Sequence, residues 1–493
     1  MSRPTGKKRV PTWLRNLGWL GVLLLGLVMI LLTALRLVEN SHQKAQALAK
    51  PGRTLQKSAS KNAVAAASAP EGSAADSRGT PLAELPLIGI HAGDDAAARQ
   101  ELGKQMEEIR ELMRSSYGCR VNGVLGFRAM LARMGMAVPE TMTEAEAAAE
   151  FLRRMERFST TLAQWQEAIG KGPWNAGGLE SKDSYATGNK MFTLAVSLQQ
   201  LMGTMAEARL RKGDTDGAWS DLKTMNVAAD RMGEALVSPV FWLWPQMFQT
   251  AHAGMMLGEW TDAQLMEIPR LLGEKNSIAS MRGEMDREQF RITGYLTHFQ
   301  ENQSRIQEDF SRSKSPVDKM FNRIGIATAT DQQISDNLAV IHFQMDQPFN
   351  RFDPVSGIYL GEQAADSGGL PHSKPSDVSF DKFYYMYSEM YGGRHDWVAE
   401  QIIRSQSSID QTRIAAALEM QHRKTGEYPA TLDAVSGTFG GSTPVDIATG
   451  QPYFYQRDAE GGYTLWGAGI DQKNDGGDEN SDVTWKHRPM KGR

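Results

Sequence analysis

The sequence predicts a mainly α-helical protein with an N-terminal transmembrane helix, a large α-helical body and a small C-terminal α+β domain that contains an antiparallel sheet. Three observations support this fold class. An uncharged apolar stretch lies near the N-terminus, a long run of helically spaced segments follows it, and two short aromatic strands lie close to the C-terminus. At 493 residues the chain is long enough for two or three domains.

Composition narrows the class of partner and the compartment. The formal net charge of −4 argues against nucleic acid as a general partner. The chain has one cysteine, Cys119, so no disulfide can form within it. Cys119 lies in a predicted helix without an obvious histidine partner, which favours an inert thiol over a nucleophile.

The N-terminal segment has the features of a membrane anchor. Basic residues fill positions 1–16, and Leu17–Leu35 carries no charge. About twenty apolar residues in a helix cross the roughly 30 Å hydrocarbon layer. A cleaved signal peptide is the alternative, but its nearest small-residue site, Ala47-Leu48-Ala49, lies far downstream. We therefore expect a single-pass protein of the inner (cytoplasmic) membrane, anchored by residues 17–36, with its N-terminus cytoplasmic and its bulk periplasmic or otherwise extracytoplasmic.

A helical body follows a tether rich in Ala, Ser, Lys and Pro. Within the body, Thr143-x-x-Glu146 predicts a capping box. Lys190–Lys212 and Asp216–Met232 predict a helical hairpin that turns at Gly213-Asp214. Val237–Gly258 is apolar enough to suggest a second span, but its prolines and polar residues favour a buried core helix.

The C-terminal region predicts one helix on a small antiparallel sheet. The helix ends at Thr425, before Gly426 and Pro429. Pro452–Tyr455 and Tyr463–Trp466 are expected strands, joined by a hairpin that contains Gly461-Gly462.

An acidic loop follows the second strand, from Gly469 to Asp482. Five carboxylates crowd this glycine-containing stretch. Hard oxygen ligands on a flexible loop suit Ca²⁺, although Lys473 stands where an EF-hand needs a ligand. From spacing alone, a calcium site and a solvated acidic turn are both open.

Several motifs in this region occur in a recognisable order. They are Gly426-x-Tyr428-Pro429, Asp446, Gly450-x-Pro452-Tyr453-x-Tyr455, and Tyr463-x-Leu465-Trp466-x-x-Gly469-x-Asp471. This order resembles the globular domain of the major pseudopilin of type II secretion. The resemblance implies that the loop binds calcium, with Asp471, Asp475, Asp478 and Asp482 as candidate side-chain ligands. Gln472 departs from the family, which usually has Gly or Asn there.

The N-terminus does not match a prepilin. The family's membrane helix follows a cleavage site and carries a glutamate at its fifth mature position, and neither is visible in Gly18–Leu35. We therefore do not expect this chain to be processed and polymerised as a pilin. The resemblance implies a calcium-binding tail with an interaction or assembly role and partners among secretion or pilus-like envelope proteins. It does not define a homo-oligomeric state.

No catalytic constellation is visible in the sequence. The chain has no phosphate-binding glycine loop, no G-x-S-x-G elbow, no H-E-x-x-H and no C-x-x-C. We therefore expect a non-catalytic envelope protein without catalytic or cofactor-binding residues other than the metal loop. An exported hydrolase with its site in the helical body is the alternative.

These features predict six segments. They are a cytoplasmic segment (1–16), the transmembrane helix (17–36), a flexible linker (37–88), the helical domain (89–348), an irregular linker (349–395) and the pseudopilin-like domain (396–493).

Overall fold

The computed structural model describes most of the chain from residue 96 onward. The described residues are 36, 38–43, 80–81, 96–116, 118–172, 174–175, 182–235, 243–273, 275–298, 302, 304, 306–307, 326–327, 329–361, 384–385, 387, 396–459 and 461–488. The predicted membrane segment 17–36 lies outside them, apart from Arg36. Among the described residues, no helix combines the length and apolarity needed to cross a membrane.

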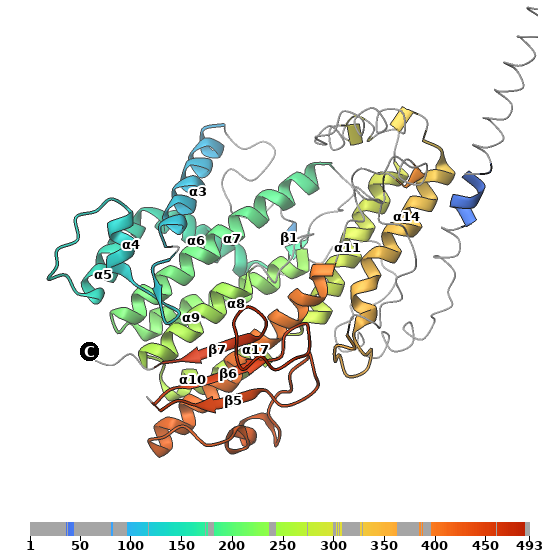
Figure 1. Cartoon of the computed structure of the whole chain (residues 1–493). Helices are drawn as coiled ribbons and strands as arrows, with labels where there is room; N and C mark the ends of the chain where they lie inside the picture. The colour runs from blue at the N-terminus through green and yellow to red at the C-terminus, as the bar shows by residue number, and fades with distance from the viewer. Residues whose placement is uncertain are drawn as a thin grey trace, which may run out of the picture. The chain divides into compact units, whose positions relative to one another are not determined.

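The described chain is mainly helical, as predicted, and carries a small C-terminal antiparallel sheet (Figure 1). The α-helices are α3 (Ala96–Ser116), α4 (Phe127–Arg133), α5 (Glu144–Met155), α6 (Ser159–Gly170), α7 (Lys182–Arg211), α8 (Thr215–Ala235), α9 (Trp244–Leu257), α10 (Asp262–Gly273), α11 (Ser277–Thr297), α14 (Asp331–Asp346) and α17 (Asp396–Thr425). The 3₁₀ helices are η2 (Glu156–Phe158), η4 (Gln347–Arg351) and η6 (Leu432–Phe439). The strands are β1 (Thr80–Pro81), β2 (Arg120–Val121), β3 (Val124–Leu125), β4 (Trp174–Asn175), β5 (Phe454–Arg457), β6 (Tyr463–Gly467) and β7 (Val483–His487).

Two compact units divide the chain. The smaller unit comprises residues 1–53, 295–345 and 367–394, and the larger comprises residues 54–294, 346–366 and 395–493. The larger unit thus contains most of the predicted helical domain together with the whole of the predicted C-terminal domain, residues 396–493. The two regions fold as parts of one unit.

Local signals position the helices of the larger unit as expected. Thr143 and Glu146 form a reciprocal capping box at the start of α5. Gly213, with φ of 78°, turns the chain between α7 and α8, which pack on each other. Thr261 and Gln264 also form a reciprocal capping pair at the start of α10, in which the backbone N–H of each residue donates to the side-chain oxygen of the other. The described part of the Val237–Gly258 stretch forms α9, a buried core helix as favoured by the sequence.

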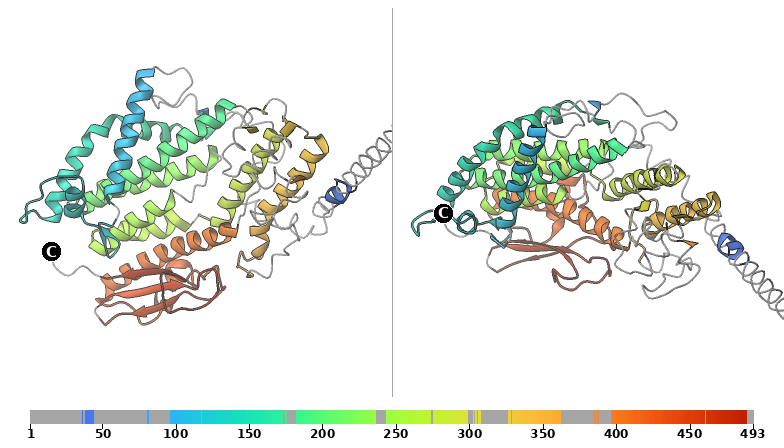
Figure 2. Two further views of the ribbon diagram at one scale, coloured as in Figure 1. Left: turned by 45° about the horizontal axis from the view of Figure 1, so that its top comes forward. Right: turned by 90° about the horizontal axis from the view of Figure 1, so that it is seen from above.

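Helix α17 lies at the centre of the larger unit. It packs on α9 and α10 on one side and on β6 and β7 on the other, so that the sheet and the helices enclose it (Figure 2). Five successive residues, Ile414–Leu418, are buried, which an amphipathic surface helix would not allow. Gly426, with φ of 81°, ends the helix as predicted.

The C-terminal sheet has the order β5-β6-β7 and is antiparallel throughout. The β5–β6 hairpin confirms the two predicted strands, although β5 begins at Phe454 rather than Pro452. Strand β7 was not predicted. It pairs with β6 in a register that sets Leu465 opposite Trp485 and Tyr463 opposite His487.

Part of the predicted irregular linker is packed. Phe352 and Tyr359 face each other across a β-bridge, and both are buried. The backbone N–H of Tyr359 donates to the carbonyl oxygen of Ile447, 2.8 Å away. Residues 352–359, named the upstream hairpin below, therefore belong to the core around the C-terminal sheet.

Candidate functional site

The acidic loop folds over the outer face of the C-terminal sheet. Tyr463 and Leu465 are fully buried on the side of β6 toward α17. Trp466 points to the opposite side, where its indole N–H donates to Asn474 Oδ1 in the loop, 2.9 Å away. A Cβ at Gly477 would lie in ordinary contact with Thr464 and Trp466. The sheet is thus covered by α17 on one face and by the loop on the other.

The four predicted calcium ligands have different surroundings. Asp471 accepts a bond from the backbone N–H of Lys473, 3.1 Å away, and Asp478 accepts from the N–H of Asn480 at the same distance. Both bonds are short-range turns within the exposed part of the loop. Asp475 is also exposed, whereas Asp482 is buried.

Asp482 is the ligand candidate with a built environment. Its Oδ2 accepts a 2.7 Å bond from the backbone N–H of Gly477, and its own N–H donates to the carbonyl oxygen of Asp478. Its Oδ1 is buried and accepts no hydrogen bond in the structure. A buried carboxylate oxygen without a donor is costly, and a cation would supply what it lacks. In the part of the chain that the structure describes, however, no three His, Cys, Asp or Glu side chains are grouped as metal ligands.

A second buried carboxylate, Asp446, joins the turn before β5 to the end of β6. Its two oxygens accept bonds from the backbone N–H groups of Ala448 (3.0 Å) and Ala468 (2.9 Å). Burial raises the pKa of Asp446, these donors lower it, and the charge of Asp482 raises it again. The negative charges of Asp446 and Asp482 therefore repel each other, and a cation near Asp482 would relieve this repulsion.

Gln472 ties the acidic loop to the upstream hairpin. Its backbone has φ of 60°, a left-handed value that few side chains adopt. Its side-chain amide donates to the carbonyl oxygens of Ala448 (2.7 Å) and Tyr359 (3.0 Å). A glycine at this position would suit the backbone but could make neither bond.

A buried polar cluster lies on the inner face of the sheet. The hydroxyl of Tyr428 donates to Glu419 Oε1, 2.8 Å away, and its oxygen lies 2.9 Å from Nε2 of His487. Burial raises the pKa of Glu419 to about 7, while Tyr428 and Arg423 lower it. Tyr428 belongs to the Gly-x-Tyr-Pro motif, but no sequence pattern marked Glu419 or His487, because they meet only in the fold.

One buried ion pair and one buried thiol in the helical body make structural contacts. The buried carboxylate of Glu207 accepts from Arg120 Nη2, 2.7 Å away, and from the backbone N–H of Leu125, 3.1 Å away. This holds the β2–β3 hairpin on α7. Cys119 is a buried free thiol, and it donates to the carbonyl oxygen of Ser115, in keeping with the inert role expected of it.

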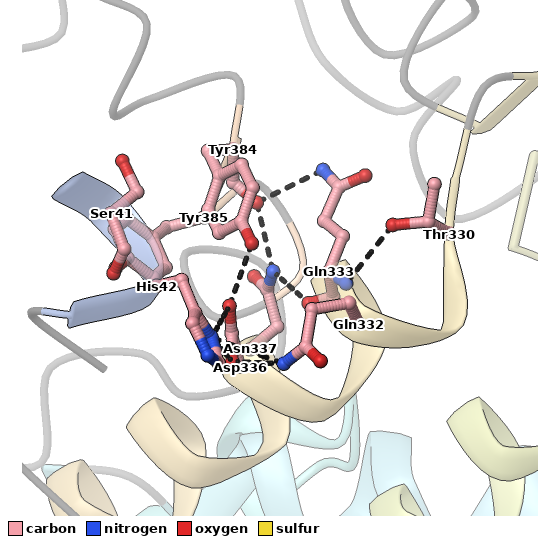
Figure 3. Close-up of polar contacts among 9 residues, drawn as sticks. All are labelled: Ser41, His42, Thr330, Gln332, Gln333, Asp336, Asn337, Tyr384 and Tyr385. Atoms are coloured by element: carbon pink, nitrogen blue, oxygen red, sulfur yellow. Dashed lines mark hydrogen bonds and ion pairs between the residues drawn. The ribbon is translucent and has the colours of Figure 1, made fainter. Parts of the chain in front are cut away.

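The smaller unit contains its own polar cluster around Asp336 on α14 (Figure 3). His42 Nδ1 lies 2.9 Å from Asp336 Oδ1, and the Tyr384 hydroxyl donates to Oδ2 at 2.6 Å. Gln333 and Asn337 both donate to the carbonyl oxygen of Tyr384. Burial and the Asp336 carboxylate raise the pKa of Tyr384, so its hydroxyl stays a donor. The cluster joins His42, 294 residues away in the chain, to α14.

Comparison with known proteins does not extend these observations, because no family model, no curated protein and no solved structure matches the chain significantly.

Proposed function

We propose that this chain is a non-catalytic, membrane-anchored cell-envelope protein whose pseudopilin-like tail binds calcium and serves an interaction or assembly role in a type II secretion or pilus-like system. The observation that carries the proposal is the order of elements in the tail. A long helix, α17, leads into an antiparallel hairpin, and an acidic loop follows and returns along the sheet as β7. The resemblance of the motifs in residues 426–471 implies the helix, the hairpin and the acidic loop in this order, but it does not imply β7.

Residues 17–36 supply the anchor in this proposal. The basic flank at positions 3–15 keeps the N-terminus in the cytoplasm, and the part of the chain after residue 36 lies outside the cytoplasm. An extracytoplasmic location also supplies the calcium, because loops of this kind often bind at about 10⁻⁴–10⁻³ M.

The calcium site is centred on Asp482. The Oδ1 atom of Asp482 has no hydrogen-bond partner, and the negative charge of Asp446 lies nearby. Both features favour a cation at this position. Asp471, Asp475 and Asp478 lie on the exposed part of the same loop, where their short side chains can turn inward to complete a ligand set. The ion would neutralise the loop and fix its end to the start of β7.

The exported hydrolase remains the alternative class. It requires an accessible polar constellation in the helical body. The buried carboxylate of Glu207 is held by Arg120 and a backbone N–H, so this acid is engaged in a structural contact.

The proposal can be tested in the source organism by deleting the gene and complementing it with the wild-type chain or with Asp482→Asn. We expect deletion to remove specific proteins from the culture medium or to abolish a surface filament, the wild type to restore them, and Asp482→Asn to restore them poorly. Asp433→Asn, in the exposed part of η6, is the matched control and should complement fully.

Two further measurements complete the test. A reporter fused after Arg493 should be active only outside the cytoplasm. A secreted-protein profile that is the same with and without the gene would refute the secretion role, and a hydrolytic activity of the purified body would favour the alternative.

A further inference from the structure

Two histidines lie at the inner face of strand β7: the half-buried His252 of α9 and the strand's own buried His487. The ring of His252 lies 4.4 Å from the ring of Trp485, and its Nε2 lies 3.3 Å from the carbonyl oxygen of Lys486. His487 follows Trp485 by two residues, on the same face of the strand, and reaches Tyr428 and Glu419 near α17. Strand β7 thus connects the helical body, through α9, with the helix of the tail.

His252 is half-buried against the helical body. A Cβ at Gly123, in the β2–β3 hairpin, would lie 2.5 Å from its ring, so the hairpin backbone closes directly over the imidazole. Arg120 and Glu207 hold that hairpin in place. Burial lowers the pKa of His252 to about 4, the Lys486 carbonyl raises it, and the charge of Arg120 lowers it further.

His487 is enclosed by aromatic rings. Its ring is stacked on Tyr463 at 5.0 Å between centroids, and Tyr428, itself stacked with His422, lies beside it. Burial lowers the pKa of His487 to about 3, and the positive charges of His252, His422 and Arg488 act in the same direction. The nearest carboxylate oxygen is Glu419 Oε1, 3.5 Å from Nδ1, and Arg488 is already paired with Asp458.

These contacts tie the packing of β7 to the charge of its two histidines. We propose that β7 is an acid-sensitive latch between the helical body and the tail, closed only while His252 and His487 are both neutral. This goes beyond the proposed function, because it would hold for any role of the tail. Protonation places two cations at the same face of one strand, in a region that already contains Arg120 and Arg488. The two charges repel each other, and the buried charge of His487 is stabilised only by reaching water, so both effects favour the separation of β7 from α9.

The direction of the pH effect follows from the pKa shifts. Both histidines have folded-state pKa values below the ordinary 6.5, so their contribution to latch closure is fully present above pH 6.5. It is lost as the pH falls toward 4 and then 3. The pKa of Glu419 is raised to about 7, so its own effect on stability has the opposite pH dependence. In acid Glu419 is largely protonated and therefore offers the histidines no counter-charge.

Hydrogen exchange of the full-length chain in detergent tests the latch. The protection factor of the peptide that covers residues 483–488 should fall by about tenfold or more between pH 6 and pH 4, since each pKa unit corresponds to a factor of ten. Protection in α4 and α5 should stay constant over the same range. Loss of protection in β7 that is matched in α4 and α5 would indicate global unfolding and overturn the proposal, as would unchanged protection in β7.

Variants assign the effect to the histidines. The double substitution His252→Gln and His487→Gln should abolish the acid-induced loss, while His298→Gln, in the turn after α11, should retain it. Glu419→Gln should also retain it, because Glu419 is neutral in acid in either case. If Glu419→Gln abolishes the response, a carboxylate and not the histidine pair controls β7, and the proposal is wrong. Should the double variant fail to fold, the wild-type exchange profile and Glu419→Gln still decide the question.

Discussion

The side-chain amide of Gln472 donates a 3.0 Å hydrogen bond to the backbone carbonyl of Tyr359, a residue 113 positions earlier in the chain. The bond joins the acidic loop to the upstream hairpin, and it forms although Gln472 has a left-handed backbone. The loop is therefore fixed at one end by Gln472 and at the other by Asp482, with its exposed aspartates between them.

Substitutions at Gln472 should separate the backbone cost from the value of its bonds. Gln472→Ala keeps the unfavourable φ and loses both bonds, so we expect a loss of about 2–3 kcal/mol in the free energy of unfolding. Gln472→Gly relieves the backbone and should lose roughly 1 kcal/mol less. Urea unfolding of the tail, followed by tryptophan fluorescence, measures both. Asn122→Gly, at the other non-glycine residue with positive φ among the described residues, is the control and should be close to neutral. Equal losses for Ala and Gly at position 472 would show that the backbone conformation is not strained.

Calcium should stabilise the full-length chain through Asp482. At ten times the dissociation constant, one bound ion adds about 1.4 kcal/mol. Differential scanning calorimetry with millimolar Ca²⁺ and with EDTA should therefore show a higher melting temperature for the calcium form. Asp482→Asn can keep the bond from Gly477 but removes the charge, so it should abolish the shift, and Asp433→Asn should leave it unchanged. A melting temperature that does not respond to calcium would indicate that the loop is a solvated acidic turn and not a calcium site.

Glu419→Gln should remove a pH dependence from the stability of the tail. The folded-state pKa of Glu419 is raised from 4.5 to about 7, so its contribution is fully present below about pH 4.5 and is lost as the pH rises through 7. Glutamine can accept the same bond from Tyr428 without this loss. Relative to wild type, the variant should therefore gain stability between pH 5 and pH 8, by roughly 3 kcal/mol at most. Urea titrations at both pH values measure the difference, with Glu427→Gln, at an exposed position, as the control. Parallel wild-type and Glu419→Gln curves would contradict the assignment.

Two helical glycines should respond to alanine in opposite directions. A Cβ at Gly254, in α9, would lie 2.1 Å from the buried ring of Trp260, whereas nothing lies within 4 Å of one at Gly294, in α11. Gly254→Ala should therefore destabilise the larger unit by about 1–3 kcal/mol. Gly294→Ala should stabilise its helix by about 0.5–1 kcal/mol, because alanine restricts the unfolded chain. Thermal unfolding monitored by circular dichroism distinguishes the two, and a neutral Gly254→Ala would show that Trp260 can move.

The sequence predicted the local structure of this chain well. The capping box at Thr143, the turn at Gly213 and the helix end at Gly426 were all confirmed, because each depends on residues only a few positions apart. The aromatic content of Tyr463–Trp466 likewise predicted β6. Strand β7 was missed because it follows the glycine-rich acidic loop and gains its strand character from pairing with β6.

The candidate site was predicted only in part. The sequence located the acidic loop, and it named four equivalent aspartates there. The structure distinguishes them, because folding the loop over Trp466 buries Asp482 and leaves Asp475 exposed. The role of Gln472 became evident only from the fold, which places Tyr359 beside it.

By itself, the sequence determined where helices begin and end, where the chain turns and which residues form the acidic loop, because caps, glycine turns and hydrophobic spacing act over a few residues. Only the tertiary structure decided which ionisable groups lose part or all of their contact with water. His252 meets the backbone of Lys486 across 234 residues, and Tyr428 meets His487 across 59. Burial of an ionisable group depends on every segment packed around it, and no local pattern records that packing. The charge states on which the proposed latch depends are therefore a property of the fold.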